Sequence, residues 1–157
     1  MGLFDWFKKQ EATTQSAQDG AAAKPLTFGE GEKQFGGLDL KAALEAHSAW
    51  KKRLRDVIEG KEAMPEIGKV ARDDLCLMGQ WLHGEGKRQF GDLPTYQMLL
   101  QTHAEFHLCV GEALSCHASG AHDQTAKLER DVRNHSDRVQ LDLVRLFVSA
   151  RATGKAA

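Results

Sequence analysis

The hydrophobic residues from Leu38 onward recur every three or four positions, which is the spacing of amphipathic helices. Four such runs are separated by breaks at 60–65, 84–94 and 119–120, which contain glycine, proline or serine. The inward positions of the first two runs are Leu40, Leu44, His47, Leu54 and Ile58, then Leu75, Met78 and Leu82. Those of the last two are Tyr96, Leu99, His103, Phe106, Val110 and Leu114, then Val132, His135, Val139, Leu143 and Leu146. Four helices with short connections predict an all-α fold, specifically an antiparallel four-helix bundle.

The N-terminal part of the chain has a different composition. Residues 11–25 are small and polar and include no large apolar side chain, so they cannot bury enough surface to offset the entropy of ordering them. We therefore expect residues 1–37 to form an N-terminal arm and flexible linker, and residues 38–153 to form the helical domain. The arm begins with an apolar, mostly aromatic cluster made of Leu3, Phe4, Trp6 and Phe7. Such a cluster suits docking to a partner groove or a membrane surface, and folding back onto the domain is the alternative.

Composition narrows the function classes. The chain has 157 residues with 21 basic and 22 acidic side chains, so it lacks the basic surplus of a non-specific nucleic-acid-binding protein. No apolar run approaches the roughly 18–20 residues of a membrane helix, and the first residues do not resemble a secretion signal, so we expect a cytoplasmic protein. Three cysteines and seven histidines in such a chain indicate thiol or metal chemistry rather than disulfides.

Four potential metal ligands fall within the expected helices: His47, Cys76, His103 and His107. The last two are four residues apart, so both imidazoles project from one face of a helix. In antiparallel helices, residues at equal distances from the connection lie at the same level. The midpoint between His47 and Cys76 falls in the first break, and the midpoint between Cys76 and His103 falls in the second. We therefore expect the four side chains to meet at one level of the core; solvated or hydrogen-bonded core histidines are the alternative interpretation.

One thiolate and three neutral imidazoles form a tetrahedral ligand set typical of zinc, and we expect one Zn²⁺ per chain. Copper would bind the same set more tightly, so this assignment also depends on metal availability. Gly79 lies one turn from Cys76, and we expect it to permit the close approach of a neighbouring helix, since glycine inside a helix costs about 0.5–1 kcal/mol relative to alanine. His135 falls at the same level of the last helix, where it would support the site, replace a ligand or simply bond within the core.

Three segments of the chain resemble the pattern of the chemoreceptor zinc-binding domain, a bacterial family. They are 47–51 (HSAWK), 74–82 (DLCLMGQWL) and 103–107 (HAEFH), which correspond to the H-x-x-W, C-x-x-G-x-W and H-x-x-x-H segments of the family. The resemblance covers residues 35 to 115, and Gln80 stands where a basic residue is common in the family. It implies a cytoplasmic helical domain that forms a symmetric homodimer and holds one zinc through the same four ligands.

The family resemblance also implies a role in signalling. Its members are usually attached to chemoreceptors or diguanylate cyclases and report zinc or oxidants such as hypochlorous acid. Since this sequence resembles neither output domain, we expect its signal to pass in trans to a separate protein. Oxidation of Cys76 would remove one of four ligands, so Cys76 is the expected redox switch. Trp50 and Trp81 are expected to pack over the metal and exclude water, with ordinary core packing as the alternative.

Two other functions are alternatives to sensing. In the first, zinc holds together a structural adaptor that docks a partner or a membrane through the N-terminal arm. The second, a zinc hydrolase, is disfavoured because four protein ligands leave no open position for water, and because Glu105 should point away from the metal. Cys109 and Cys116 are expected to be small buried or interfacial residues. The sequence therefore predicts a regulatory zinc-binding domain and not an enzyme.

Overall fold

The computed structural model describes residues 34–155. The N-terminal cluster and the linker 11–25 lie outside these residues. The described elements are β1 (Gln34–Phe35), β2 (Leu38–Asp39), α2 (Leu40–Ile58), α3 (Ile67–Val70), α4 (Leu77–His83), α5 (Glu85–Phe90), α6 (Pro94–Ala118) and α7 (His122–Ala152). The predicted all-α class is confirmed, with one small two-stranded sheet added to it.

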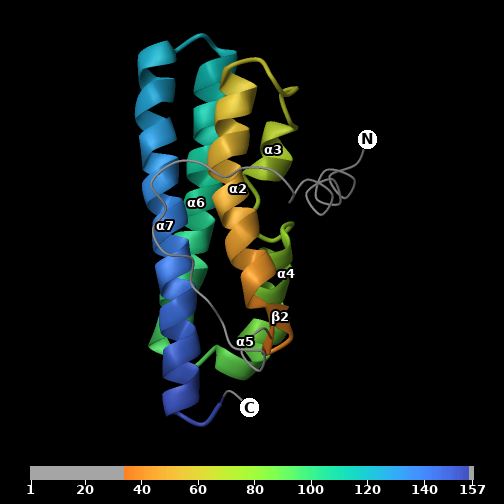
Figure 1. Cartoon of the computed structure of the whole chain (residues 1–157), viewed down its shortest axis with the longest axis vertical. Coiled ribbons are helices and arrows are strands. Elements are labelled where there is room, and N and C mark those ends of the chain that lie inside the picture. The colour runs from red at the N-terminus through yellow and green to blue at the C-terminus, as the bar shows by residue number, and fades with distance from the viewer. Residues whose placement is uncertain (1–33, 156–157) are drawn as a thin grey trace.

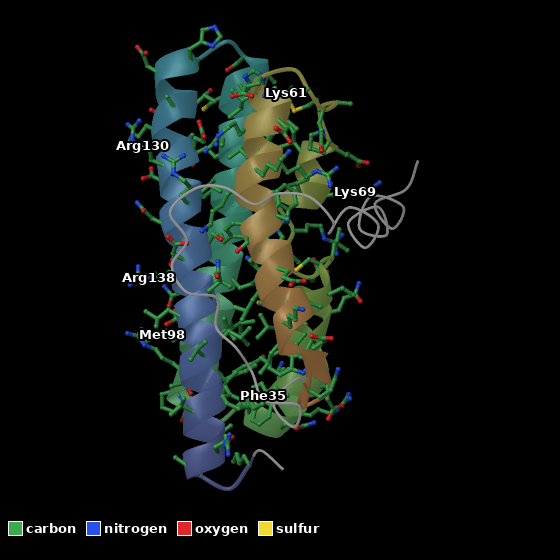
Figure 2. The ribbon with its side chains drawn as sticks, in the orientation of Figure 1. Phe35, Lys61, Lys69, Met98, Arg130 and Arg138 are labelled. Atoms are coloured by element: carbon green, nitrogen blue, oxygen red, sulfur yellow. The ribbon has the colours of Figure 1, made fainter. Side chains whose placement is uncertain are left out.

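Three long helices, α2, α6 and α7, lie side by side around the core (Figure 1). The chain turns back from α6 into α7 through a short connection in which Gly120 has a φ of +77°, a conformation that glycine adopts without strain. The apolar stripes of these helices face inward as predicted, and both Leu99 and Val132 are 0% exposed. Figure 2 shows Arg130 and Arg138 on the outer side of α7, so this helix is amphipathic in the predicted sense.

The ends of the long helices agree with the signals in the sequence. The side chain of Asp39 accepts a hydrogen bond from the Ala42 N–H at 2.9 Å and so caps the start of α2, which ends before Gly60. Pro94 occupies the first turn of α6, where its missing N–H is not needed. Within the part of the chain that the structure describes, no helix has both the length and the apolar character needed to cross a membrane.

The second of the four predicted helices ends before Gly84 as predicted, but it begins only at Leu77, after Leu75 and Cys76. Between α2 and α6 the chain forms three short helices, of which α3 and α4 follow one another along one side of the long helices (Figure 1). Arg72 and Asp74 pair at 2.6 Å in the turn before α4. Cys76 has extended backbone angles and is the N-cap of α4, so it does not lie inside a helix as predicted. The break escapes detection because the apolar residues of 75–82 keep helical spacing across it.

The fold therefore consists of three long helices with a segmented fourth side, rather than the four continuous helices of the predicted bundle. This difference matters for the site, because the segmented side contributes Cys76. A helix start and the turn before it can place backbone groups next to a neighbouring helix, whereas a continuous helix has already used them in its own hydrogen bonds.

A β-hairpin precedes α2 and was not predicted, because strands of two residues are too short to show an alternating pattern. Phe35 pairs with Leu38 across a turn at Gly36 and Gly37, both of which have positive φ. Phe35 is 2% exposed, and its ring stacks on Phe90 of α5 at a centroid distance of 4.6 Å. Figure 2 shows Phe35 beside α5 at the lower end of the molecule. Packing onto the core therefore starts before Leu38, within the segment assigned to the arm.

Candidate metal centre

Cys76, His103 and His107 meet in the core where the start of α4 faces α6. Their ligand atoms, one from each side chain, all lie within 4.8 Å of one another. The Sγ of Cys76 is 3.2 Å from the Nε2 of His103. The three residues are 7%, 0% and 2% exposed. The structure thus brings three of the four predicted ligands into one buried cluster.

The two histidines and the cysteine are positioned by different means. His103 and His107 lie one turn apart on α6 with their ring centroids 4.8 Å apart, as the spacing predicts. Cys76 reaches the cluster from the end of α4, where its Sγ accepts a hydrogen bond from the Gly79 N–H at 3.2 Å. The sulfur of Cys76 thus takes the place of the side-chain oxygen that usually caps the start of a helix. The midpoints calculated from the sequence placed Cys76 at the correct level of the core. They did not reveal that Cys76 lies at the N-terminal end of a helix.

The orientation of His107 is set by the backbone of α3. Its Nδ1 lies 2.7 Å from the carbonyl oxygen of Val70. Because a carbonyl only accepts hydrogen bonds, Nδ1 carries the proton and Nε2 keeps the lone pair that a metal needs. Sequence reasoning missed Val70, because a backbone carbonyl has no residue-type signature; the general tendency of metal-binding histidines to donate their second N–H was the one available signal.

His47 lies beside the cluster rather than within the mutually close set. It is 3% exposed on α2, and its ring centroid is 5.4 Å from that of His103. Its backbone carbonyl accepts a hydrogen bond from the Ser136 hydroxyl of α7 at 3.2 Å. α2 and α7 are therefore joined at the level of the site.

Burial keeps the imidazoles neutral. It lowers the pKa of His47 from 6.5 to about 3, with a further contribution from the neighbouring His107. Burial followed by the charge of His107 lowers the pKa of His103 well below its usual value, and burial also lowers the pKa of His107. At pH 7 each ring therefore has a lone pair available for a cation.

Burial has the opposite consequence for the thiol. It raises the pKa of Cys76 from 9.0 to about 11, although the Gly79 N–H acts in the other direction. Without a cation the sulfur is therefore a thiol at neutral pH. A metal ion that binds the sulfur would displace this proton.

The donor set fits zinc. Among the described residues, five buried histidine ring nitrogens have no hydrogen-bond partner, and three of them belong to the site: His47 Nδ1, His103 Nδ1 and His107 Nε2. Leaving a buried polar atom in this state costs roughly 1–3 kcal/mol. A thiolate and several imidazole nitrogens are ligands that zinc binds together, and coordination would remove part of this penalty. Cys76, His103 and His107 are therefore the residues that could hold the metal, with His47 next to them.

Phe106 is the aromatic residue that covers the histidines. Its ring centroid is 4.7 Å from that of His47 and 5.3 Å from that of His107. Trp50 is 4% exposed and packs edge-on against Phe106 at 6.5 Å, so it contacts the site through that ring. Sequence analysis placed Phe106 in the core but did not connect it with the site.

Trp81 packs in the core, which agrees with the alternative that the sequence left open. Its Nε1 donates a hydrogen bond to the Gly36 carbonyl of the hairpin at 2.7 Å. Its ring lies 5.8 Å from Phe35 and 6.0 Å from Phe90. These contacts join α4 to the N-terminal hairpin, which the sequence did not reveal because the hairpin itself was not predicted.

Gly79 is required by a close approach, as predicted, but the neighbour is not a helix. A Cβ at this position would lie 1.6 Å from the backbone oxygen of Asp73. The turn that precedes Cys76 therefore folds tightly over the first turn of α4. Any side chain at Gly79 would displace this turn and, with it, the cysteine.

Replacing Gly79 with alanine is expected to destabilise the domain by about 3 kcal/mol, because the methyl group must push a backbone segment aside. Urea unfolding monitored by circular dichroism measures this change. Gly68→Ala on α3 is the matched control, since a Cβ there would meet nothing within 4 Å. Equal stabilities for the two variants would contradict the close approach.

The remaining sequence candidates lie outside the cluster. His135 is half-buried on α7, and it is its neighbour Ser136 that bonds to the site helix α2. The inward position predicted for His135 is therefore taken by Ser136, which is 0% exposed. Cys109 is buried on α6 with its Sγ 3.9 Å from the Leu128 carbonyl, and Cys116 is a half-buried free thiol. The description as small packed residues is confirmed for Cys109.

Fold and site together define a helical domain with a buried cysteine–histidine cluster that could hold a metal ion. Residues 47–114 match the model of the family described as the chemoreceptor zinc-binding domain, which supports a domain of that family in this part of the chain. The match spans all four candidate ligands. No curated protein and no solved structure matches the chain. The family is a regulatory zinc-binding domain rather than a known enzyme family, so membership implies a zinc-binding regulatory role.

Proposed function

We propose that this domain is a regulatory zinc sensor that reports to a signalling protein of the chemoreceptor or diguanylate cyclase type. The observation that carries the proposal is the buried cluster in which the Sγ of Cys76 and nitrogens of His103 and His107 lie within 4.8 Å of one another. Burying three polar side chains is unfavourable unless they find partners, and a single cation satisfies all three at once. The family match over residues 47–114 supports zinc as that cation.

His47 is proposed as the fourth ligand, so that one zinc ion is bound per chain. Its ring already contacts that of His103, and its Nδ1 is buried without a partner in the described part of the chain. Four protein ligands would leave no open position for a catalytic water, which favours regulation over catalysis. Glu105 supports the same conclusion, because it accepts a hydrogen bond from Gln101 at 2.9 Å on the exposed side of α6.

Cys76 is the residue through which an oxidant would act. Bound zinc would hold its sulfur as the thiolate, the nucleophilic form. Hypochlorous acid converts a thiolate to a sulfenic acid and is itself reduced to chloride, so two electrons leave the sulfur and one oxygen is added to it. That oxygen must fit at a position only 7% exposed, at the N-cap of the seven-residue α4. A weaker sulfur donor and a displaced helix start would both loosen the site.

The contacts of α4 support a route by which such a change leaves the site. Cys76 begins this short helix, and Trp81 near its other end binds the Gly36 carbonyl and packs against Phe35. A shift of α4 would therefore act directly on the β-hairpin. The hairpin is the proposed output element of the domain.

The partner arrangement is proposed as a homodimer in the cytoplasm that passes its signal in trans. Large apolar side chains are exposed on the two longest helices, which supports an interface there. They are Met98 and Leu108 of α6, and Leu141 and Val148 of α7. Figure 2 shows Met98 on the same side of the molecule as α7. Native mass spectrometry of the protein measures the subunit number.

Replacing Cys76 with alanine tests the sensor function. We expect the variant to bind zinc more weakly through its histidines and to release no zinc in response to hypochlorous acid, whereas the parent protein releases it. Native mass spectrometry before and after the oxidant reports metal content, subunit number and the mass added to cysteine. Cys109→Ala is the matched control, because Cys109 is a buried thiol of α6 outside the cluster. Oxidant-driven zinc release that is the same in Cys76→Ala and in the parent would contradict redox sensing.

A further inference from the structure

Gly111 of α6 lies one turn after His107, where α3 packs against α6. A Cβ at this position would lie 2.8 Å from the Cβ of Ala71 and 3.4 Å from its Cα. Ala71 directly follows α3, and its Cβ is attached to the backbone and cannot rotate aside. The two segments can approach this closely only because residue 111 is glycine.

The same approach brings α3 into contact with the metal centre. Val70 precedes Ala71, is 3% exposed, and its carbonyl accepts the Nδ1–H of His107 at 2.7 Å. This hydrogen bond leaves the buried Nε2 of His107 with its lone pair, as a metal ligand requires. The Ala71–Gly111 contact and the Val70–His107 hydrogen bond are thus adjacent parts of one interface.

Apart from its contact with α6 through Ala71, α3 is held by its two apolar side chains, Val70 in the core and Ile67 packed against it. The helix contains four residues, and its N-cap Glu66 makes no side-chain capping bond. A Cβ at Gly68 would meet nothing within 4 Å, and Figure 2 shows Lys69 directed outward. The placement of the Val70 carbonyl therefore depends on the contact that the end of α3 makes with α6.

We propose that Gly111 is a positioning residue for the metal centre: it admits α3 close enough to α6 for the Val70 carbonyl to fix the tautomer of His107. A methyl group at residue 111 would move α3 by about 1 Å, since non-bonded carbon atoms prefer separations of about 3.5–4.0 Å. The hydrogen bond would then lengthen beyond its normal range of about 2.7–3.2 Å. His107 would lose the partner that keeps Nε2 free for a cation.

Gly111→Ala tests this proposal, which rests on the proposed zinc site. We expect zinc affinity, measured by competition with a chromophoric chelator, to fall about 10- to 100-fold, the usual effect of losing the partner of a metal-binding histidine. We also expect the ¹⁵N NMR signals of the His107 ring in the zinc-free protein to change from the Nδ1–H form to a mixture of tautomers. The second change reports the position of the proton and not the stability of the fold.

The double variant Gly111→Ala with Ala71→Gly provides the matched rescue. It removes the Cβ that the new methyl group would meet and is expected to restore both the Nδ1–H form and most of the zinc affinity. Gly68→Ala, which adds a methyl group to α3 in open space, should change neither. If Gly111→Ala does not fold, Ala71→Val narrows the same gap from the four-residue α3 and should have the same two effects.

The proposed zinc site and the proposed role of Gly111 are contradicted by different results. A parent protein that binds no zinc overturns the proposed function, while the tautomer measurement on zinc-free protein still tests Gly111. Gly111→Ala or Ala71→Val that keeps the Nδ1–H form of His107, with zinc affinity within twofold of the parent, overturns the role of Gly111. Loss of affinity that the Ala71→Gly rescue does not reverse also overturns it.

Discussion

Replacing His103 with alanine is expected to lower zinc affinity by about a hundredfold or more and to leave the domain largely metal-free. His103 is 0% exposed, its Nε2 lies 3.2 Å from the sulfur of Cys76, and its ring contacts those of His47 and His107. A structural zinc site contributes about 10–16 kcal/mol in all, so one of four ligands accounts for about 3 kcal/mol, or about two orders of magnitude. Metal competition titration measures the loss.

Two further variants make this result specific to the site. His122→Ala removes an exposed histidine at the start of α7 and should leave zinc affinity unchanged. His47→Ala is expected to lower the affinity less than His103→Ala, by about tenfold, because His47 lies beside the mutually close set of ligands rather than within it. A His103→Ala protein that folds, as judged by circular dichroism, and binds zinc as well as the parent would show that the metal is held elsewhere.

Acidification is expected to unfold the zinc-free domain over a range in which most proteins of this size remain folded. The folded-state pKa of His47 is about 3, and those of His103 and His107 are also lowered by burial from 6.5. The unfolded chain therefore binds more protons than the folded one at acidic pH. Stability is fully present above pH 6.5 and is lost as the pH falls from about 6.5 toward about 3. Each buried histidine contributes a slope of up to about 1.4 kcal/mol per pH unit.

Alkaline conditions are also expected to destabilise the zinc-free domain, in this case through the thiol of Cys76. Burial raises the pKa of Cys76 from 9.0 to about 11, so the unfolded chain loses its proton first, and stability declines as the pH rises through this interval. The zinc-free domain should thus be most stable between about pH 6.5 and pH 9. Urea unfolding of chelator-treated protein at several pH values measures both slopes.

A variant and a metal titration distinguish protonation of the buried histidines from acid unfolding of a general kind. His47→Leu should reduce the acid slope by the contribution of one histidine, whereas His122→Ala should not change it. Zinc should shift acid unfolding to lower pH, because bound imidazoles cannot take up protons. Stability that is the same at pH 7 and pH 5 in the zinc-free parent would be incompatible with three neutral buried histidines.

Both predictions have the same physical basis: at the level of the site, polar side chains occupy positions in the core that are usually apolar. Three imidazoles and a thiol are removed from water, and among the described residues their hydrogen-bond partners outside the cluster are few: the Val70 carbonyl for His107, and the Gly79 N–H and the Asp73 carbonyl for Cys76. Without a cation the cluster therefore opposes folding, and with a cation it favours folding. A domain built in this way links metal binding to its conformation, which is what a sensor requires.

Local information in the sequence determined the long helices and the pairing of His103 with His107. Helical periodicity, Pro94 at the start of α6 and the Ser119–Gly120 break are properties of neighbouring residues, so they can be interpreted without knowing the fold. The level at which Cys76 meets the histidines also followed from the sequence, since it depends on distances along the chain from the connections. The resemblance to the zinc-binding family followed from three short segments in the correct order, and the family model matches residues 47–114.

Tertiary structure alone decided how those ligands are held. Cys76 stands at a helix end because the preceding turn folds over Gly79, the Val70 carbonyl orients His107 because α3 reaches α6 at Gly111, and Phe106 rather than Trp81 covers the rings. These features depend on backbone groups and on contacts between residues distant in the chain. Neither leaves a periodic or compositional trace, because a carbonyl oxygen is present at every residue and the reason for a glycine lies in the segment that packs against it.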